Sequence, residues 1–101
     1  MRYSVEITGP AEQNIEEAHD WIHAESHAAA AHWIDGLLAS FLSLETFPLR
    51  CPMAPERSDH EEEIRQLLYG RYRILFVVRK RKVFVLHIRH SSRDRARIDE
   101  L

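Results

Sequence analysis

The chain of 101 residues has a single cysteine, Cys51. One cysteine excludes an internal disulfide and a cysteine-based zinc site, and this usage suits a reducing cytosol. No apolar run approaches the ~18 residues of a membrane span, and the first residues lack the apolar segment of a signal peptide. We therefore expect a cytoplasmic protein that has no membrane partner and needs no metal or cofactor.

Repeats and composition shifts that would mark a second domain are also lacking. Of the 101 residues, 45% are hydrophobic, and a chain of this length buries roughly 60 to 70% of its unfolded surface. That is enough for one core. We expect a single domain over residues 1–101.

Acidic and basic residues are segregated along the chain. Residues 1–63 hold 3 Lys and Arg against 13 Asp and Glu, whereas residues 64–101 hold 11 against 3. The two halves therefore carry −10 and +8, which sum to the net charge of −2. A basic half is typical of a surface that meets phosphate or an acidic protein segment. The alternative is that the halves neutralise each other through surface ion pairs.

Strand patterns occupy the basic half and the N-terminus. Three short runs rich in Val, Ile, Leu and aromatic residues cover residues 64–69, 72–79 and 83–88. Gly70 separates the first two, and the charged tip at residues 80–82 is too short for a crossover helix, so the runs predict an antiparallel meander. At the N-terminus, Tyr3, Val5 and Ile7 alternate with polar residues, which predicts a strand that joins an edge of the meander.

Two amphipathic helices are predicted between these strands. Thr8 and Ser26 are candidate N-caps. Phe47-Pro48 is expected to end the second helix, because proline disfavours helical geometry in the residue before it. Apolar residues recur at helical steps: Ala11, Ile15, Ala18 and Ile22 in the first helix, and Ala30, Trp33, Ile34, Leu37, Leu38, Phe41 and Leu44 in the second.

The predicted fold class is α+β. An N-terminal strand precedes a two-helix hairpin, which packs on an antiparallel sheet completed by the three-stranded C-terminal meander. The polar, Pro-rich residues 48–63 are interpreted as a connector, although loops of this length are often functional. Ser91-Ser92 is expected to cap a last short helical stretch over residues 93–101.

This order of elements, together with four short segments, resembles the RelE/ParE toxin superfamily. The segments are residues 30–35, Phe47-Pro48, residues 64–67 followed by 70–76, and residues 88–93. The resemblance implies a small bacterial toxin of a type II toxin–antitoxin pair. Because a disordered acidic tail can add a strand or helix to a basic sheet edge, we expect a cognate antitoxin with an acidic C-terminal segment.

The superfamily divides by target. RelE-like members cut ribosome-bound mRNA, which calls for a base, an acid and cations around the phosphate. Arg73 matches a phosphate-contacting arginine of that branch and Arg93 falls near a second, but no Tyr or His follows Arg93. We therefore favour a ParE-like toxin that inhibits DNA gyrase by binding. The alternatives are a RelE-like mRNA endonuclease and a non-toxic, antitoxin-binding or regulatory relative.

Five residues form the candidate binding set: Arg65, Arg71, Arg73, His90 and Arg93. Arg71 and Arg73 share strand parity, so one interpretation is that their guanidinium groups converge on one face and grip phosphate or carboxylate. The alternative is that they are solvated charges at the sheet edge. In a nuclease, Arg73, Arg93 and His90 would be the catalytic candidates. His87 is interpreted as a packed histidine, since it alternates with core valines.

His19, His23 and His27 stand at four-residue steps, and two imidazoles at this spacing can hold a metal ion. No acidic third ligand accompanies them in the pattern. A solvent-facing polar stripe is therefore the favoured interpretation. Cys51 has no histidine at a recognised nucleophile spacing and is interpreted as incidental.

Overall fold

The structure is a computed structural model that describes residues 2–56 and 62–91. Its elements are β1 (Ser4–Ile7), α1 (Gly9–Glu25), α2 (His27–Ser43), the 3-10 helix η1 (Pro48–Arg50), β2 (Arg65–Tyr69), β3 (Tyr72–Arg79) and β4 (Lys82–His90). This α+β order of strand, two helices and three strands confirms the prediction. Within the described ranges, no helix is long and apolar enough to cross a membrane.

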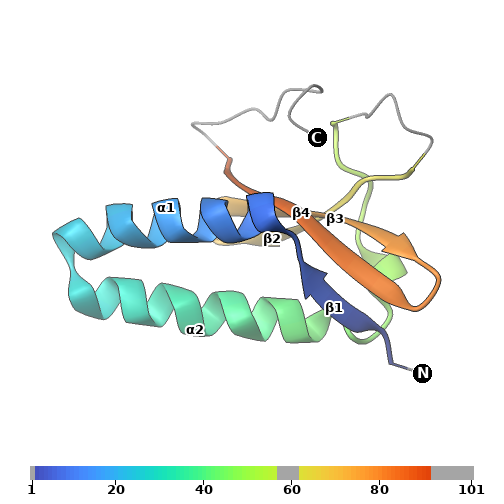
Figure 1. Cartoon of the computed structure of the whole chain (residues 1–101), viewed down its shortest axis with the longest axis horizontal. Coiled ribbons are helices and arrows are strands. Elements are labelled where there is room, and N and C mark those ends of the chain that lie inside the picture. Colours follow the sequence, from blue (N-terminus) through green and yellow to red (C-terminus); the bar gives the residue numbers. More distant parts are fainter. Residues whose placement is uncertain (1, 57–61, 92–101) are drawn as a thin grey trace.

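The four strands form one sheet in the order β1-β4-β3-β2. Strands β2, β3 and β4 pair antiparallel as the predicted meander. Strand β1 joins the free edge of β4, as expected for the N-terminal strand, and it runs parallel, with Val5 opposite Val83. The sheet is therefore mixed. The turn between α1 and α2 lies at the opposite end of the molecule from β1 (Figure 1).

Both predicted N-caps are confirmed. The Thr8 hydroxyl accepts a hydrogen bond from the Ala11 N–H at 3.4 Å and donates to the Val85 carbonyl at 2.7 Å, which ties the start of α1 to β4. Ser26 ends α1 and begins α2, because its hydroxyl accepts from the Ala29 N–H at 3.1 Å. A connection of one residue forces the two helices into an antiparallel hairpin.

The second helix ends earlier than the sequence predicts. Proline at Phe47-Pro48 was expected to end it, but α2 stops at Ser43 and Pro48 begins η1. The Arg50 guanidinium donates to the main-chain oxygens of Ser43, Thr46 and Phe47 at 3.3, 2.8 and 3.1 Å. Those oxygens lie at and just beyond the helix end, where carbonyl groups lack helical partners, so Arg50 stabilises the early stop.

The main core lies between the helices and the sheet. Trp33 and Leu37 of α2 are buried in it, as predicted. Leu38 was placed on the same stripe but is 54% exposed, because one residue along a helix turns the side chain by about 100°. The same core contains Ala11, Ala18, Phe41, Leu44, Ile74, Phe76, Val83, Val85 and Ile88.

A second, smaller cluster covers the other face of the sheet. Ala54 and Ile64 pack there against Leu75 and Val77 of β3. The Ala54 N–H donates to the Ile64 carbonyl at 2.8 Å, which ties the segment after η1 to the start of β2. The interpretation of this segment as a plain connector is wrong for residues 51–56, since they close one side of the sheet.

Gly36 of α2 lies against Tyr69 of β2. A Cβ atom on Gly36 would lie 2.1 Å from the Tyr69 hydroxyl, which donates to the Trp33 carbonyl at 2.9 Å. Gly36→Ala must displace this ring, so we expect it to lower the free energy of unfolding by about 1–3 kcal/mol in a urea melt. Gly9→Ala is the control, because its Cβ would meet nothing within 4 Å. An equal loss of unfolding free energy in the two variants would contradict the close contact between Gly36 and Tyr69.

Candidate functional site

Arg73 holds a carboxylate from the segment that covers the sheet. It alternates with Ile74, which faces the helices, so its side chain lies on the opposite face. Its two terminal nitrogens donate to Glu56 at 2.8 and 2.5 Å, and the side chains of Arg73 and Glu56 are only 11% and 5% exposed. The hydrogen bonds to Glu56 raise the pKa of Arg73 above its ordinary value. Arg73 is therefore charged and buried, and its terminal nitrogens are already hydrogen-bonded to Glu56.

The predicted convergence of Arg71 and Arg73 is wrong. Arg71 lies in the turn before β3, next to Gly70, whose φ is 56°. Strand alternation does not extend into a turn, so shared parity does not put the two side chains on one face. Arg71 instead lines a groove that residues of α1 and α2 also line.

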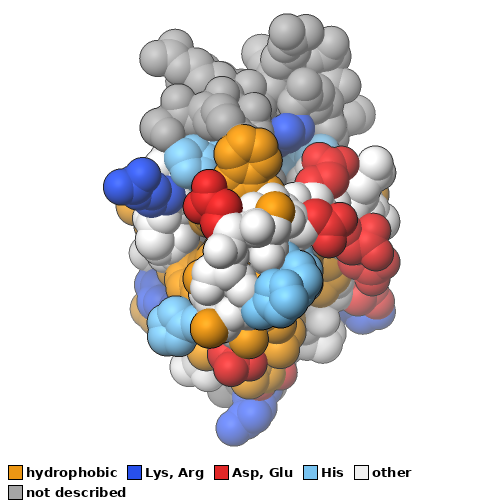
Figure 2. All heavy atoms as spheres, turned by 90° about the vertical axis from the view of Figure 1, so that its left-hand side faces the viewer, with side chains coloured by type: hydrophobic (Ala, Val, Ile, Leu, Met, Phe, Trp, Pro, Cys, Tyr) orange, Lys and Arg blue, Asp and Glu red, His pale blue; other side chains and the backbone are white. Residues whose placement is uncertain are grey.

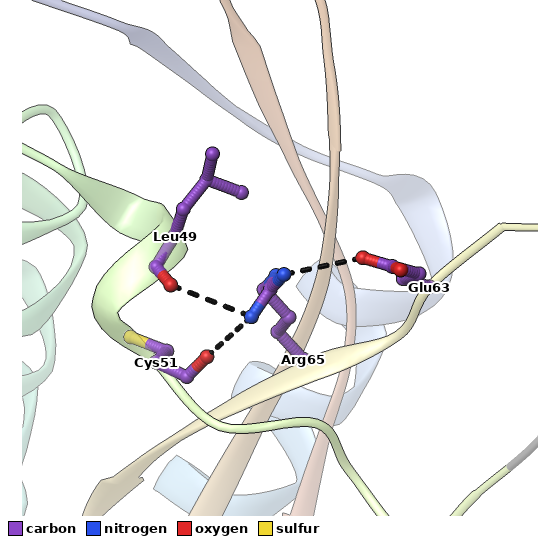
Figure 3. Close-up of polar contacts among 4 residues, drawn as sticks. All are labelled: Leu49, Cys51, Glu63 and Arg65. Carbon is purple, nitrogen blue, oxygen red and sulfur yellow. Dashed lines mark hydrogen bonds and ion pairs between the residues drawn. The ribbon is translucent and has the colours of Figure 1, made fainter.

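Arg65 fastens the segment after η1 to the sheet (Figure 3). Its guanidinium donates to the carbonyls of Cys51 and Leu49 at 2.7 and 3.4 Å, and it pairs with Glu63 at 3.1 Å. Its contacts are therefore structural. Cys51 is buried beside it, and burial raises the pKa of the thiol. A protonated, buried thiol is a poor nucleophile, which agrees with the incidental role expected for Cys51.

His90 ends β4 and lies opposite Tyr72 in the β3–β4 register. The two rings meet edge to face, with centroids 5.2 Å apart. Both line an open groove of about 400 Å³. The residues around it are Trp21, Ile22, Glu25, Ser26, Ala29, Arg71, Tyr72 and His90. The structure thus brings together two members of the candidate set, Arg71 and His90, between the helical hairpin and the end of the sheet.

His87 is packed, as interpreted from its alternation. It is buried, and its Nδ1 lies 3.2 Å from the Asn14 side-chain oxygen, which also accepts from the Ile88 N–H at 3.0 Å. The β3–β4 register shifts next to His87, between Leu75 and Phe76. At this irregularity Asn14 provides a hydrogen-bond partner for the His87 ring nitrogen and the Ile88 main-chain N–H. Arg93 and the helical stretch expected over residues 93–101 lie outside the described residues.

The three spaced histidines stack at the tip of the helical hairpin. Ring centroids are 5.5 Å apart for His19 and His23 and 3.8 Å apart for His23 and His27. Histidine side chains are visible on the surface in the view onto this end of the molecule (Figure 2). Among the described residues, no three or more His, Cys, Asp or Glu side chains are grouped so that they could hold a metal ion.

Ion pairs join the acidic and basic halves of the chain. Arg65, Arg73 and Arg79 pair with Glu63, Glu56 and Glu62 in turn. The alternative that the acidic and basic halves neutralise each other through ion pairs therefore holds for these three arginines. At the β3–β4 tip, Lys80 and Lys82 stay exposed.

Sequence reasoning missed three residues of these sites: Glu56, Trp21 and Tyr72. Nothing local to Glu56 indicates that it pairs with an arginine 17 positions later. Trp21 carried a usable signal, because it is an aromatic residue that falls off the apolar stripe of α1. Tyr72 is a strand residue like its neighbours, and only the fold shows that its ring lines the groove.

Comparisons with known proteins agree with this fold. The chain is similar to a chain of the chromosomal ParDE toxin–antitoxin system from P. aeruginosa, with a TM-score of 0.70 and 15% identity over 88% of this chain and 96% of that chain. It is also similar to a chain of the RelBE2 toxin–antitoxin complex from Mycobacterium tuberculosis, with a TM-score of 0.56 and 21% identity over 89% and 92%. A search of curated proteins finds no match. The family described as ParE toxin of type II toxin–antitoxin system, parDE, matches residues 5–95, so the chain belongs to the ParE toxin family.

Proposed function

We propose that this type II toxin inhibits DNA gyrase by binding to it and does not cut RNA. The observation that carries the proposal is the buried ion pair between Arg73 and Glu56. Arg73 matches the phosphate-contacting arginine of RelE-like nucleases, yet both of its terminal nitrogens already hold a buried carboxylate. RNA phosphate would have to displace Glu56, which would separate a buried carboxylate from the arginine that holds it.

The position of His90 supports the same proposal. An acid or base must lie within hydrogen-bond reach of the reacting atoms, about 2.6–3.2 Å, or act through one water. His90 lines the groove on the helix side of the sheet, whereas Arg73 lies on the opposite face. His87 is buried against Asn14. Neither histidine shares a face with Arg73 in a position to complete a nuclease site around it.

The alternative function is a RelE-like mRNA endonuclease that acts on the ribosome. One observation favours it: Arg89 lies directly opposite Arg73 in the β3–β4 register. Two guanidinium groups on neighbouring strands can hold one phosphate. A third candidate is a family member that has lost toxicity and only binds an antitoxin.

Purified toxin added to a gyrase supercoiling assay and, separately, to a translating extract tests this proposal. We expect supercoiling to be inhibited while ribosome-bound mRNA stays intact. Cleavage at defined codon positions that disappears in Arg73→Ala would establish the endonuclease instead. Inactivity in both assays, with a folded protein, would favour the non-toxic alternative.

We further propose a cytoplasmic antitoxin whose acidic C-terminal segment meets the exposed basic side chains. Because Arg65 and Arg73 are paired internally, the exposed Lys80 and Lys82 are better placed to attract it. Charge complementarity acts mainly on the encounter rate. Reversal of both lysines to glutamate should slow association by more than about tenfold at low salt.

Stopped-flow association measures this effect, and the dissociation rate serves as the internal control. We expect dissociation to change little, since exposed rim charges contribute little to holding a complex together. An association rate that is the same at about 50 mM and about 500 mM salt would contradict electrostatic attraction as the driving force.

A further inference from the structure

The proposed function assigns no ligand to the groove beside the helical hairpin. Its volume of about 400 Å³ lies within the range of small-molecule sites, roughly 300–1,000 Å³. Its walls come from the end of α1, the start of α2, the turn before β3 and the end of β4. The core holds the Tyr72 side of the groove in place, since Trp33 packs on Tyr72 with centroids 5.2 Å apart.

Aromatic side chains line this groove. Trp21 is 62% exposed, which is notable because a tryptophan is highly buried on average. Tyr72 and His90 meet edge to face in the same lining. Hydrophobic side chains reach the surface among charged and histidine side chains at this end of the molecule (Figure 2). Flat rings of this kind hold a flat ligand by stacking, and every nucleobase offers a π-face.

Polar groups of both signs accompany the rings. Arg71 is exposed and has no ion-pair partner within the part of the chain that the structure describes. A guanidinium matches the geometry of a phosphate group. Glu25 supplies carboxylate acceptors, and the Ser26 hydroxyl, which accepts from Ala29, keeps its own proton to donate.

We propose that the groove binds a nucleotide. The base stacks on Trp21 and Tyr72, the phosphate pairs with Arg71, and Glu25 accepts a hydrogen bond from an exocyclic amino group or a ribose hydroxyl. This binding goes beyond gyrase inhibition and does not depend on it. The nucleotide is either free or part of a single strand, since both present the same base and phosphate.

Simpler occupants use only part of the lining. An apolar side chain of a protein partner would stack on Trp21 but would desolvate Arg71 and Glu25 without hydrogen bonds in return. Inorganic phosphate would pair with Arg71 and leave the aromatic rings unused. A base that carries a phosphate uses both parts of the groove at once.

Calorimetric titration with AMP, adenosine and inorganic phosphate tests the proposal on the whole purified chain. We expect the parent chain to bind both AMP and adenosine saturably. Trp21→Ala should weaken the binding of each by about tenfold or more. Arg71→Gln should weaken AMP binding by about tenfold, and the affinity for adenosine should stay within about twofold of the parent's. Arg81→Gln is the matched control in the turn between β3 and β4. It should change neither AMP binding nor adenosine binding. Thermal melts show whether each variant is folded, and both tested side chains are exposed.

Absence of heat with AMP at about 5 mM would overturn the proposal. Unchanged AMP binding in Trp21→Ala or in Arg71→Gln would also overturn it, as would phosphate binding without adenosine binding. A short single-stranded RNA separates the two sources of ligand. Binding more than about tenfold tighter than AMP identifies a strand, and equal affinity identifies the free nucleotide. Because gyrase is absent from this titration, its outcome is independent of the supercoiling result.

Discussion

Replacement of Trp33 or Leu37 by alanine is expected to lower the free energy of unfolding by about 2–5 kcal/mol. The two side chains are 8% and 1% exposed. The Trp33 ring lies 6.4 and 5.2 Å, centroid to centroid, from the rings of Tyr69 and Tyr72 on the sheet. Truncation removes these contacts and leaves a cavity that the hydrogen-bonded strands cannot close.

Urea unfolding measures the loss, and α2 supplies its own control. Leu38→Ala makes the same chemical change one residue along the helix, at an exposed position. We expect it to cost less than about 1 kcal/mol, as most exposed substitutions do. Equal midpoint shifts for Leu37→Ala and Leu38→Ala would show that α2 does not pack on the sheet through the face described above.

Removal of the Glu56 carboxylate is expected to cost a comparable 3–5 kcal/mol, roughly the loss when one partner of a buried ion pair is deleted. Among the described residues, Glu56→Ala would leave the buried Arg73 guanidinium with the Gln66 side-chain oxygen, 3.2 Å away, as its remaining side-chain acceptor. The desolvated charge, more than the lost contact, causes the destabilisation.

The exposed pair of Arg79 and Glu62 is the control, since its side chains are 51% and 37% exposed. Glu62→Ala should cost at most about 1 kcal/mol. Replacement of both Arg73 and Glu56 by methionine should cost less than Glu56→Ala alone, because both charges of the buried pair are then removed together. A double variant as unstable as Glu56→Ala would contradict this explanation.

Local signals account for most of the fold that could be predicted from the sequence. Alternation at Tyr3, Val5 and Ile7 and the caps at Thr8 and Ser26 each depend on a few neighbouring residues, and all of them hold. The parallel pairing of β1 with β4 joins segments far apart in the chain, and no local pattern encodes its direction. The end of α2 depends on Arg50, seven residues beyond Ser43.

The candidate site was less predictable, because each part of it is non-local. Strand alternation predicts a face of the sheet for Arg71, but this residue lies in the turn before β3. The partner of Arg73 comes from a segment without periodicity, so Glu56 could not be recognised beforehand. The groove exists only because the hairpin tip meets the strand ends. The role of Arg93 stays a prediction.

The number of target molecules that one toxin molecule inactivates decides most directly between binding and catalysis. An enzyme turns over repeatedly, typically at ~1–10³ per second, whereas a binding inhibitor is consumed by each target that it holds. The measurement is a titration of a fixed amount of DNA gyrase with purified toxin, followed by supercoiling, beside a matched titration of ribosome-bound mRNA. We expect supercoiling to fall in proportion to added toxin until the two proteins are about equimolar, with the mRNA intact. Many mRNA molecules cut per toxin molecule, with gyrase unaffected, would contradict a toxin that acts by binding.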